Sequence, residues 1–354
     1  MKILDSYIGQ VVTVSVIAVA AVLMTLFALI GLANEAGSVG RADYTFMAVL
    51  VYTLLRVPFQ LYQIFPLSVL LGTMLGLGMM ATHAELIVIR ASGVSIARIV
   101  ISVIKSMAVL IVIVIFIGEV IAPPAHQYAI HSRLKALESK ISLNTDYGLW
   151  ARDGDTYIHV RHVENDGRLM DVSLYRFNEK LEMESVLLAE TGIYDGNQWI
   201  LDKVKKSTIS AVGTSIKEIS TIKWHSLLAP DLVDVVSVNP ETLSSFKLFG
   251  YIDYLETNGL ESSQYKLVLW NRLLMPFTII AMILLAVPFV FGSLRQGGIG
   301  QKIVVGFLAG IIFYILNRLA GQIGLVYDLP AVLAAGIPTL LVLIGSAWLF
   351  RRIR

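Results

Sequence analysis

The chain contains no cysteine among its 354 residues. Disulfide bonds, thiolate metal sites and a cysteine nucleophile are therefore excluded. A chain without cysteine is compatible with either side of a bacterial inner membrane, so its absence leaves the redox compartment open.

Charged side chains are also scarce. Only 15% of the residues are charged and 56% are hydrophobic, whereas roughly a quarter of the residues of a soluble domain are charged. Of the 26 acidic residues, 20 lie between Glu138 and Glu261. The net charge of +2 therefore averages two different populations and gives no reason to expect a nucleic-acid partner. These proportions are typical of a polytopic membrane protein.

Motifs for chemistry are missing as well. No stretch matches the G-x-x-x-x-G-K-[ST] phosphate loop, and the nearest candidate, Gly297–Lys302, lacks both its spacing and its hydroxyl. No carboxylate cluster or nucleophile elbow occurs. His159 and His162 point to opposite faces of an expected strand. His126 and His131 are about 140° apart on a helix. We therefore expect no enzyme, no metal site and no cofactor bound by this chain.

Six apolar segments are long enough to cross a bilayer, whose core of about 30 Å needs about 20 residues of helix. They are Ile8–Asn34, Val57–Thr82, Ser106–Ile121, Leu273–Leu294, Ile303–Val326 and Leu329–Phe350. We expect Pro123 and Pro124 to end the third span, because proline breaks a helix interior. Arg56 and Pro58 are expected to separate the second span from an interfacial helix at Met47–Leu55.

Lysine and arginine near the span ends indicate which side faces the cytoplasm. With the N-terminus inside, nine of them lie on the cytoplasmic side and three on the other. The nine are Lys2, Arg90, Arg98, Lys105, Arg295, Lys302, Arg351, Arg352 and Arg354, and the three are Arg41, Arg56 and Arg318. We therefore expect both termini in the cytoplasm and the long insert outside, in the periplasm of a gram-negative cell.

A soluble, strand-patterned insert separates spans three and four, so the expected domains are residues 1–132, 133–261 and 262–354. Hairpins are expected around Asp153-Gly154-Asp155 and around Asp195-Gly196-Asn197. Many short strands favour a β-sandwich or jelly roll, and hence an α+β membrane protein. The insert could enclose an apolar groove or offer an edge strand to another chain. The alternative is a packed domain that only supports the membrane part.

The turn between spans two and three carries a short apolar helix at residues 83–93. It contains Glu85 and Arg90, and Gly93 is expected to end it. Two interpretations are open. The helix either lies in the membrane interface or docks in a groove on a cytoplasmic partner.

Several short motifs carry a resemblance to a known family. They are Leu4–Gly9, Tyr52–Pro58, Leu75–Gly78, Glu85–Ser95, Gly118–Pro123, Gly148–Gly154 and Phe291–Arg295. Through their order and the three-plus-three layout of spans, the chain resembles the LptF/LptG family of lipopolysaccharide-export permeases over nearly its whole length. Within that family it is most like the LptG members.

The resemblance implies an inner-membrane subunit of six spans with a periplasmic β-jellyroll, paired with an LptF-like subunit. It also implies an LptB-type ATPase dimer that binds ATP and magnesium, and an LptC-like, membrane-anchored periplasmic protein that receives lipopolysaccharide. The turn helix is then the coupling helix, in which Glu85 contacts the ATPase. The other residues implied in coupling are Leu86, Ile87, Arg90, Ala91, Ser92 and Gly93.

Basic residues that could meet lipid phosphates are few. Family members can carry lysines at the outer end of span one, but Gly31–Gly40 contains none and only Arg41 remains. Arg133 matches a basic position beyond span three, and its alternative role is an exposed helix charge. Arg318 lies roughly 22 Å along span five. We hypothesise that Arg318 pairs with a lipid A phosphate, and the alternative is a side chain that snorkels to the interface.

Two other classes of function are weighed against export. A membrane scaffold or sensor could bind envelope lipid or protein through its outer β-domain. Co-purification with an ATPase would favour the exporter, and a kinase or regulator partner would favour the sensor. An intramembrane enzyme has less support, because no catalytic constellation occurs in the spans.

Overall fold

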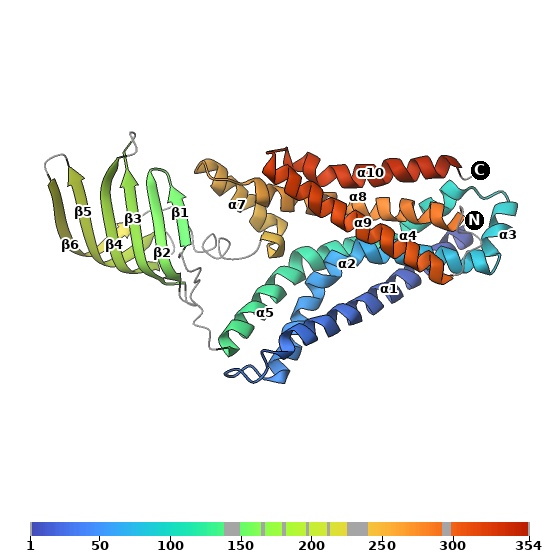
Figure 1. The fold of residues 1–354 in the computed structure, drawn as a ribbon, viewed down its shortest axis with the longest axis horizontal. Helices are drawn as coiled ribbons and strands as arrows, with labels where there is room; N and C mark the ends of the chain where they lie inside the picture. Colours follow the sequence, from blue (N-terminus) through green and yellow to red (C-terminus); the bar gives the residue numbers. More distant parts are fainter. Residues whose placement is uncertain are drawn as a thin grey trace. The chain divides into compact units, whose positions relative to one another are not determined.

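The computed structural model describes residues 2–137, 149–163, 167–178, 182–195, 198–210, 213–224, 240–291 and 299–352. The chain forms two compact units. The helical unit comprises Met1–Val39, Thr45–Ile130 and Ser263–Arg354, and the β unit comprises Gly40–Tyr44 and His131–Ser262. Within the described residues, six helices are long and apolar enough to cross a membrane (Figure 1). The predicted fold class, six spans with an inserted β-domain, is confirmed.

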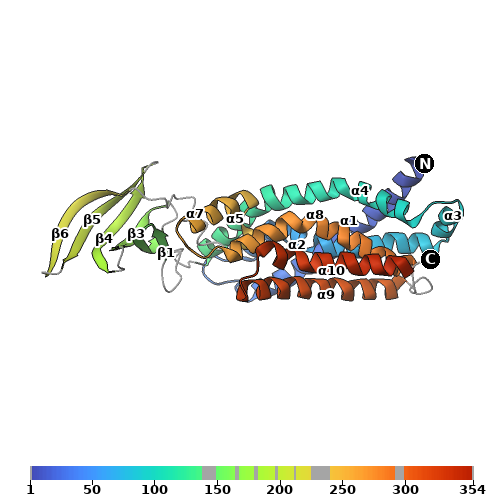
Figure 2. The same cartoon turned by 90° about the horizontal axis from the view of Figure 1, so that it is seen from above.

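Long helices make up the helical unit and run side by side along it (Figures 1 and 2). They are α1 (Lys2–Ala36), α2 (Phe46–Thr82), α4 (Ile96–Phe116), α5 (Ala122–Ala136, which continues into the β unit), α8 (Ser263–Phe291), α9 (Ile299–Val326) and α10 (Ala331–Arg352), and the short helix α3 (Glu85–Ala91) lies between α2 and α4 in the chain. The short helix α3 and both ends of the chain lie at the same end of this unit (Figure 1). Six apolar spans make the protein a multi-pass membrane protein.

Helix α2 corrects one prediction from the sequence. It is continuous over 37 residues and contains Pro58, so the separate interfacial helix expected at Met47–Leu55 is wrong. Proline removes a single helical hydrogen bond, and neighbouring helices can compensate for that loss in a membrane protein. Tyr52 and Thr53, which precede the proline, are only 9% and 6% exposed. Burial of this segment therefore keeps it in the same helix as the span.

The prolines beyond span three also behave differently from the prediction. Pro123 and Pro124 do not stop the helix. Helix α4 passes through a π-helical turn at Ile117–Ile121 into α5, and the N–H of Ala122 bonds to the carbonyl of Ile117. The wider turn places both prolines in the first turn of α5, where a missing N–H is tolerated.

Two glycines let α1 and α2 approach closely. A Cβ placed on Gly72 would overlap the backbone of Val16, and one on Gly76 would lie 3.1 Å from the Cα of Val12. Small residues at this spacing allow membrane helices to pack backbone against backbone. Val12 and Val16 are fully buried and belong to the main apolar core of the helical unit.

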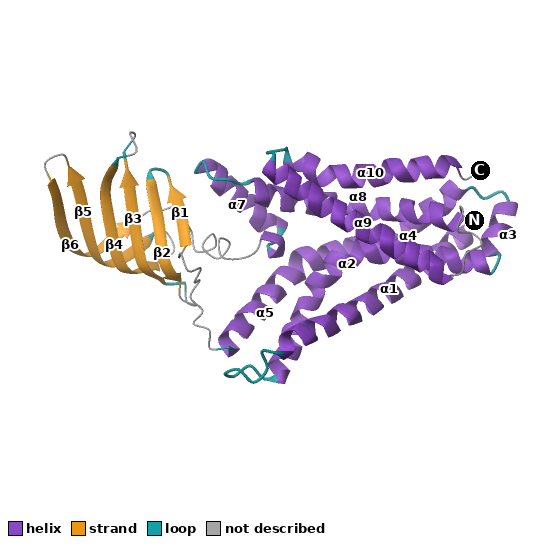
Figure 3. Ribbon diagram, viewed as in Figure 1, coloured by secondary structure: helices purple, strands orange, loops and turns teal. Residues whose placement is uncertain are grey.

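The β unit contains one six-stranded antiparallel sheet (Figure 3). Its strands are β1 (Leu149–Asp153), β2 (Thr156–Val163), β3 (Leu169–Phe177), β4 (Met183–Tyr194), β5 (Trp199–Ser210) and β6 (Gly213–Trp224), and the 3-10 helix η2 (Pro240–Thr242) and helix α7 (Ser245–Thr257) follow them. Among the described residues the strands pair in chain order, as a meander without a crossover.

Both predicted hairpins are confirmed. Asp153 pairs with Thr156 across a two-residue turn, and Gly154 in that turn has a φ of +57°, a conformation that glycine adopts readily. Tyr194 pairs with Trp199 in the second hairpin. Two of its turn residues, at positions 196 and 197, lie outside the described residues.

One face of the sheet is buried. Ile158 and Val160 of β2 stand opposite Leu174 and Val172 of β3, and none of these four side chains is more than 6% exposed. Because side chains alternate along a strand, Tyr157 and Tyr175 point to the opposite face. The two faces of the sheet therefore differ in burial.

Candidate functional site

The short helix α3 has one buried and one exposed side. Leu86 and Ile89 are 3% and 8% exposed and pack into the main core of the helical unit. Ile87 and Val88 are 48% and 68% exposed. The other residues on the exposed side are Arg90, Ala91, Ser92 and Gly93. One apolar side of α3 is thus already covered by the protein, and the other side is accessible.

Both ends of α3 are sharply defined. Ala84 precedes it with a φ of +61° and Gly93 follows it with a φ of +88°. The N–H of Val94 reaches the carbonyl of Ile89 at 3.4 Å, and the Ser92 hydroxyl donates to the same carbonyl at 2.7 Å. This is the glycine-containing C-terminal cap expected at Gly93.

Glu85, at the start of α3, contacts the first span. The Tyr7 hydroxyl donates to Oε2 of Glu85 at 2.9 Å. Nearby on α1, Asp5 accepts a hydrogen bond from Ser102 at 2.8 Å and forms an ion pair with Arg98 at 3.3 Å. Surface ion pairs of this kind contribute little free energy, but the contacts connect the first turns of α1 to both α3 and α4.

Two of the three candidate lipid-binding arginines occupy neighbouring segments of the β unit. The Asp43 N–H donates to the Ala136 carbonyl at 3.0 Å, which joins the turn carrying Arg41 to the end of α5. Arg41 is exposed, and Arg133 in the last turn of α5 is half-buried. The structure therefore brings these two segments together, although they are far apart in the sequence.

Arg318, the third candidate, lies on an exposed side of α9 in the helical unit. It donates a hydrogen bond to the Tyr314 hydroxyl, one turn earlier, at 3.3 Å. Ile315 and Leu319 beside it are 50% and 52% exposed. Arg318 thus lies on a side of α9 that also exposes apolar side chains, and an arginine in such a position extends towards polar groups at the membrane surface.

A buried ion pair joins spans three and four, and sequence reasoning missed it. Arg272 of α8 donates to Glu119 of the π-helical turn at 3.0 Å, and the two side chains are only 7% and 23% exposed. The guanidinium carbon of Arg272 lies 5.8 Å from the ring centroid of Tyr62 on α2. Ionisable residues within spans are functional candidates by default. The sequence feature that could have revealed this ion pair is the occurrence of one acidic and one basic residue, Glu119 and Arg272, each within an apolar segment.

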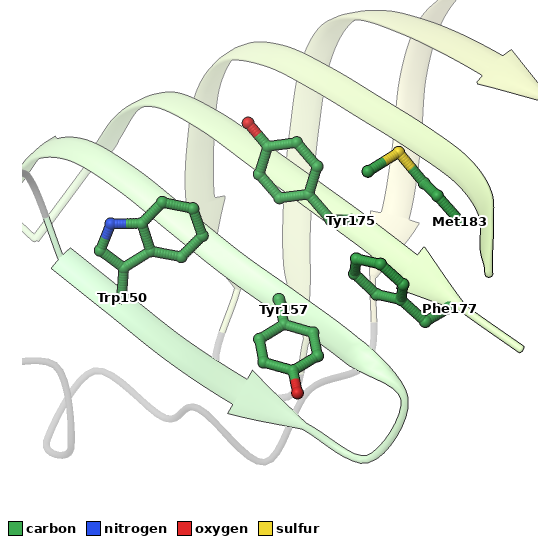
Figure 4. Close-up of a pocket in the computed structure, with 5 residues that line it drawn as sticks. All are labelled: Trp150, Tyr157, Tyr175, Phe177 and Met183. Carbon is green, nitrogen blue, oxygen red and sulfur yellow. The ribbon is translucent and has the colours of Figure 1, made fainter. Parts of the chain in front are cut away.

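An apolar cavity of about 360 Å³ lies on the less buried face of the sheet (Figure 4). It is lined by Trp150, Tyr157, Tyr175, Phe177 and Met183. The Trp150 and Tyr175 rings stack with centroids 5.9 Å apart, and Tyr157 meets Phe177 edge to face at 5.4 Å. Four aromatic rings from three adjacent strands therefore form one continuous apolar surface.

Two of the histidines have aromatic neighbours. His126 packs against Phe59 with ring centroids 5.1 Å apart, and His159 lies 4.5 Å from Trp150. Within the described part of the chain, no group of three or more metal-binding side chains comes together.

Comparison with known proteins identifies a family. Residues 6–352 match the family described as lipopolysaccharide export system permease LptF/LptG. The chain is 33% identical to the permease protein LptG of Escherichia coli strain K12 over 357 residues, which cover 99% of this chain and 98% of that protein. It is 34% identical to LptG of Haemophilus influenzae strain Rd over 353 residues, which cover 99% of both chains. With its six spans and inserted β-domain, the chain therefore belongs to the LptF/LptG family of lipopolysaccharide export permeases.

Proposed function

We propose that this chain is the LptG-type permease subunit of an ATP-driven exporter. The exporter extracts lipopolysaccharide from the inner membrane and passes it to a periplasmic bridge. Family membership supports the permease role. The observation that carries the ATP-driven part is α3, because its Leu86 and Ile89 side is packed in the bundle while Ile87 and Val88 remain accessible.

The proposed assembly contains several partners. An LptF-like subunit pairs with this chain, and an LptB-type ATPase dimer with its own ATP and magnesium supplies the energy, because this sequence has no phosphate loop. An LptC-like periplasmic protein accepts the lipid. In this arrangement both termini and α3 are cytoplasmic and the β unit is periplasmic, in line with the excess of basic residues at the corresponding span ends.

Docking on a partner explains α3 better than burial in the membrane interface. An interfacial helix buries a broad apolar face in lipid, but the buried side of α3 is occupied by the protein core. Its accessible side combines Ile87 and Val88 with Arg90, and Glu85 stands at its beginning. ATP-dependent closure of the ATPase would move α3 only if α3 contacts the open and closed states differently. Helices α2 and α4, which precede and follow α3 in the chain, would transmit that movement to a lipid-holding cavity that we propose between this chain and the LptF-like subunit.

Replacing Glu85 by alanine tests this proposal. We expect ATPase that co-purifies with the membrane subunits to decrease, or lipopolysaccharide released per ATP to fall several-fold, because a charge-assisted contact is lost. Both quantities are measured on complexes reconstituted in liposomes. Asp253→Ala removes an exposed carboxylate of α7 and serves as the control. Normal ATPase association together with normal lipid release in Glu85→Ala would falsify the coupling role. Recovery of a kinase or regulator in place of an ATPase would favour the alternative function, a membrane scaffold or sensor.

The lipid path in this proposal uses the three arginines and the aromatic cavity. Arg41, Arg133 and Arg318 meet lipid phosphates, since guanidinium groups bind phosphate through paired hydrogen bonds. The cavity around Tyr175 receives acyl chains, because its lining is almost entirely apolar. Acyl chains and phosphates are the two parts of the lipid that differ most in polarity, so separate surfaces of this kind suit them.

Arg318→Ala is expected to reduce the arrival of lipid at the Tyr175 cavity several-fold, since the proposed contact between the guanidinium and a lipid phosphate is removed. The measurement is the yield of lipopolysaccharide adduct at a photo-reactive residue in place of Tyr175, with and without ATP. Arg318→Lys keeps the charge and should retain most of the yield. A photo-reactive residue at Ile216, which is 71% exposed on β6, is the control position. An unchanged adduct yield in Arg318→Ala would exclude a role of Arg318 in lipid transport. The absence of any adduct at position 175 in every variant would exclude the aromatic cavity from the lipid path.

A further inference from the structure

Tyr7 lies on the first span, 78 residues before the carboxylate that it contacts. Within the described part of the chain, no other side chain donates a hydrogen bond to Glu85. We propose that Tyr7 is a positioning residue that orients Glu85 and makes the first span follow the movement of α3. This inference rests on the coupling role proposed for Glu85.

The backbone at the two ends of α3 makes its orientation depend on side-chain contacts. Ala84 and Gly93 both have positive φ angles, +61° and +88°, so α3 continues neither α2 nor α4 as a helix. A non-glycine residue such as Ala84 keeps this conformation only where surrounding contacts hold it. The seven residues between these two turns form one short helix, and tertiary contacts determine how that helix is oriented.

Two kinds of contact hold α3, and they act differently. Leu86 and Ile89 pack in the apolar core, and apolar packing is not directional. The hydrogen bond from Tyr7 to Glu85 is directional and has a charged acceptor, which strengthens it. It therefore fixes the direction in which the Glu85 carboxylate points at the start of α3. One hydrogen bond at Oε2 leaves the carboxylate further lone pairs with which to contact a basic group of the ATPase.

The same part of α1 is attached to α4. Asp5, two residues before Tyr7, accepts from the Ser102 hydroxyl at 2.8 Å and pairs with Arg98 at 3.3 Å. A displacement of α3 thus reaches α1 directly through Tyr7, and α4 reaches it through Asp5. The first span becomes part of the pathway from the ATPase into the membrane, in addition to the two spans that flank α3.

Tyr7→Phe tests the inference, because it removes the hydroxyl and keeps the ring. The full complex is reconstituted in liposomes, and the moles of lipopolysaccharide released per mole of ATP hydrolysed are measured for each assembled complex. We expect this ratio to fall about threefold to tenfold, as for the loss of one solvent-exposed hydrogen bond, with ATPase association retained. Tyr128→Phe, at a tyrosine of α5 that is 65% exposed, should leave the ratio unchanged.

A double variant separates positioning from general stability. In a Glu85→Ala background, Tyr7→Phe should cause no further fall in the ratio, because the hydroxyl no longer has an acceptor to orient. A purely structural role would reduce the amount of complex and leave the ratio per complex unchanged, which would overturn the inference. A normal ratio in Tyr7→Phe with a low ratio in Glu85→Ala overturns the role of Tyr7 alone. Normal ratios and ATPase association in both single variants overturn the coupling role of Glu85 as well.

Discussion

Glu119→Ala is expected to destabilise the helical unit by about 3–5 kcal/mol, the cost of leaving one member of a buried ion pair without its partner. The charge left behind belongs to Arg272, which is 7% exposed at its side chain. Arg272→Ala should destabilise by a similar amount for the same reason. The measurement is the thermal unfolding of the purified subunit in nanodiscs, followed by loss of intact protein after heating.

Double variants distinguish this ion pair from an ordinary packing defect. Replacing both residues by apolar ones, Glu119→Leu with Arg272→Met, should recover most of the stability, since a buried pair is often replaced by apolar side chains without loss. The exchange Glu119→Arg with Arg272→Glu should recover part of it. If the single variants unfold at the wild-type temperature, the pair has no structural role. If the apolar double variant is as unstable as the single ones, the cost comes from packing rather than from the uncompensated charge.

Gly72→Ala is expected to destabilise the packing of α1 on α2 by about 1–3 kcal/mol, the usual cost of inserting an atom into a filled core. The new Cβ would overlap the backbone of Val16, and a backbone cannot move aside as a flexible side chain can. The helices must therefore separate. The same thermal unfolding assay measures this effect, together with the recovery of assembled complexes.

A matched glycine provides the control for Gly72. Gly345 lies within α10, and a Cβ there would have no neighbour within 4 Å, so Gly345→Ala should be neutral or slightly stabilising. Val16→Ala combined with Gly72→Ala should restore only part of the stability, because the nearest obstacle is the Val16 backbone. Equal stability of Gly72→Ala and Gly345→Ala would contradict the close approach of the two helices.

Sequence patterns predict an element correctly where residues close together in the sequence determine its structure. The Asp153-Gly154-Asp155 turn was readable because glycine readily adopts the positive φ that it has there. The apolar spans were readable because a bilayer requires long uncharged helices. The cap at Gly93 followed from the same reasoning about glycine at helix ends.

Local rules failed where neighbouring helices outweigh them. Pro58 was expected to divide a helix, but burial of Tyr52 and Thr53 keeps α2 continuous. Pro123 was expected to end a span, but a π-helical turn at Ile117–Ile121 accommodates it. In both cases the local cost of a proline is a few kcal/mol, which helix packing in the membrane can compensate.

The sequence by itself determined the class of protein: six spans, an inserted β-domain, a turn helix with Glu85 and a family resemblance that comparison confirmed. Only the tertiary structure decided which side chains meet. Glu119 and Arg272 are 153 residues apart, and Tyr7 and Glu85 are 78 residues apart. Hydrophobicity and turn chemistry act over a few residues, so they predict the elements. Contacts between distant residues depend on how whole helices pack against one another, which no short segment of the sequence specifies.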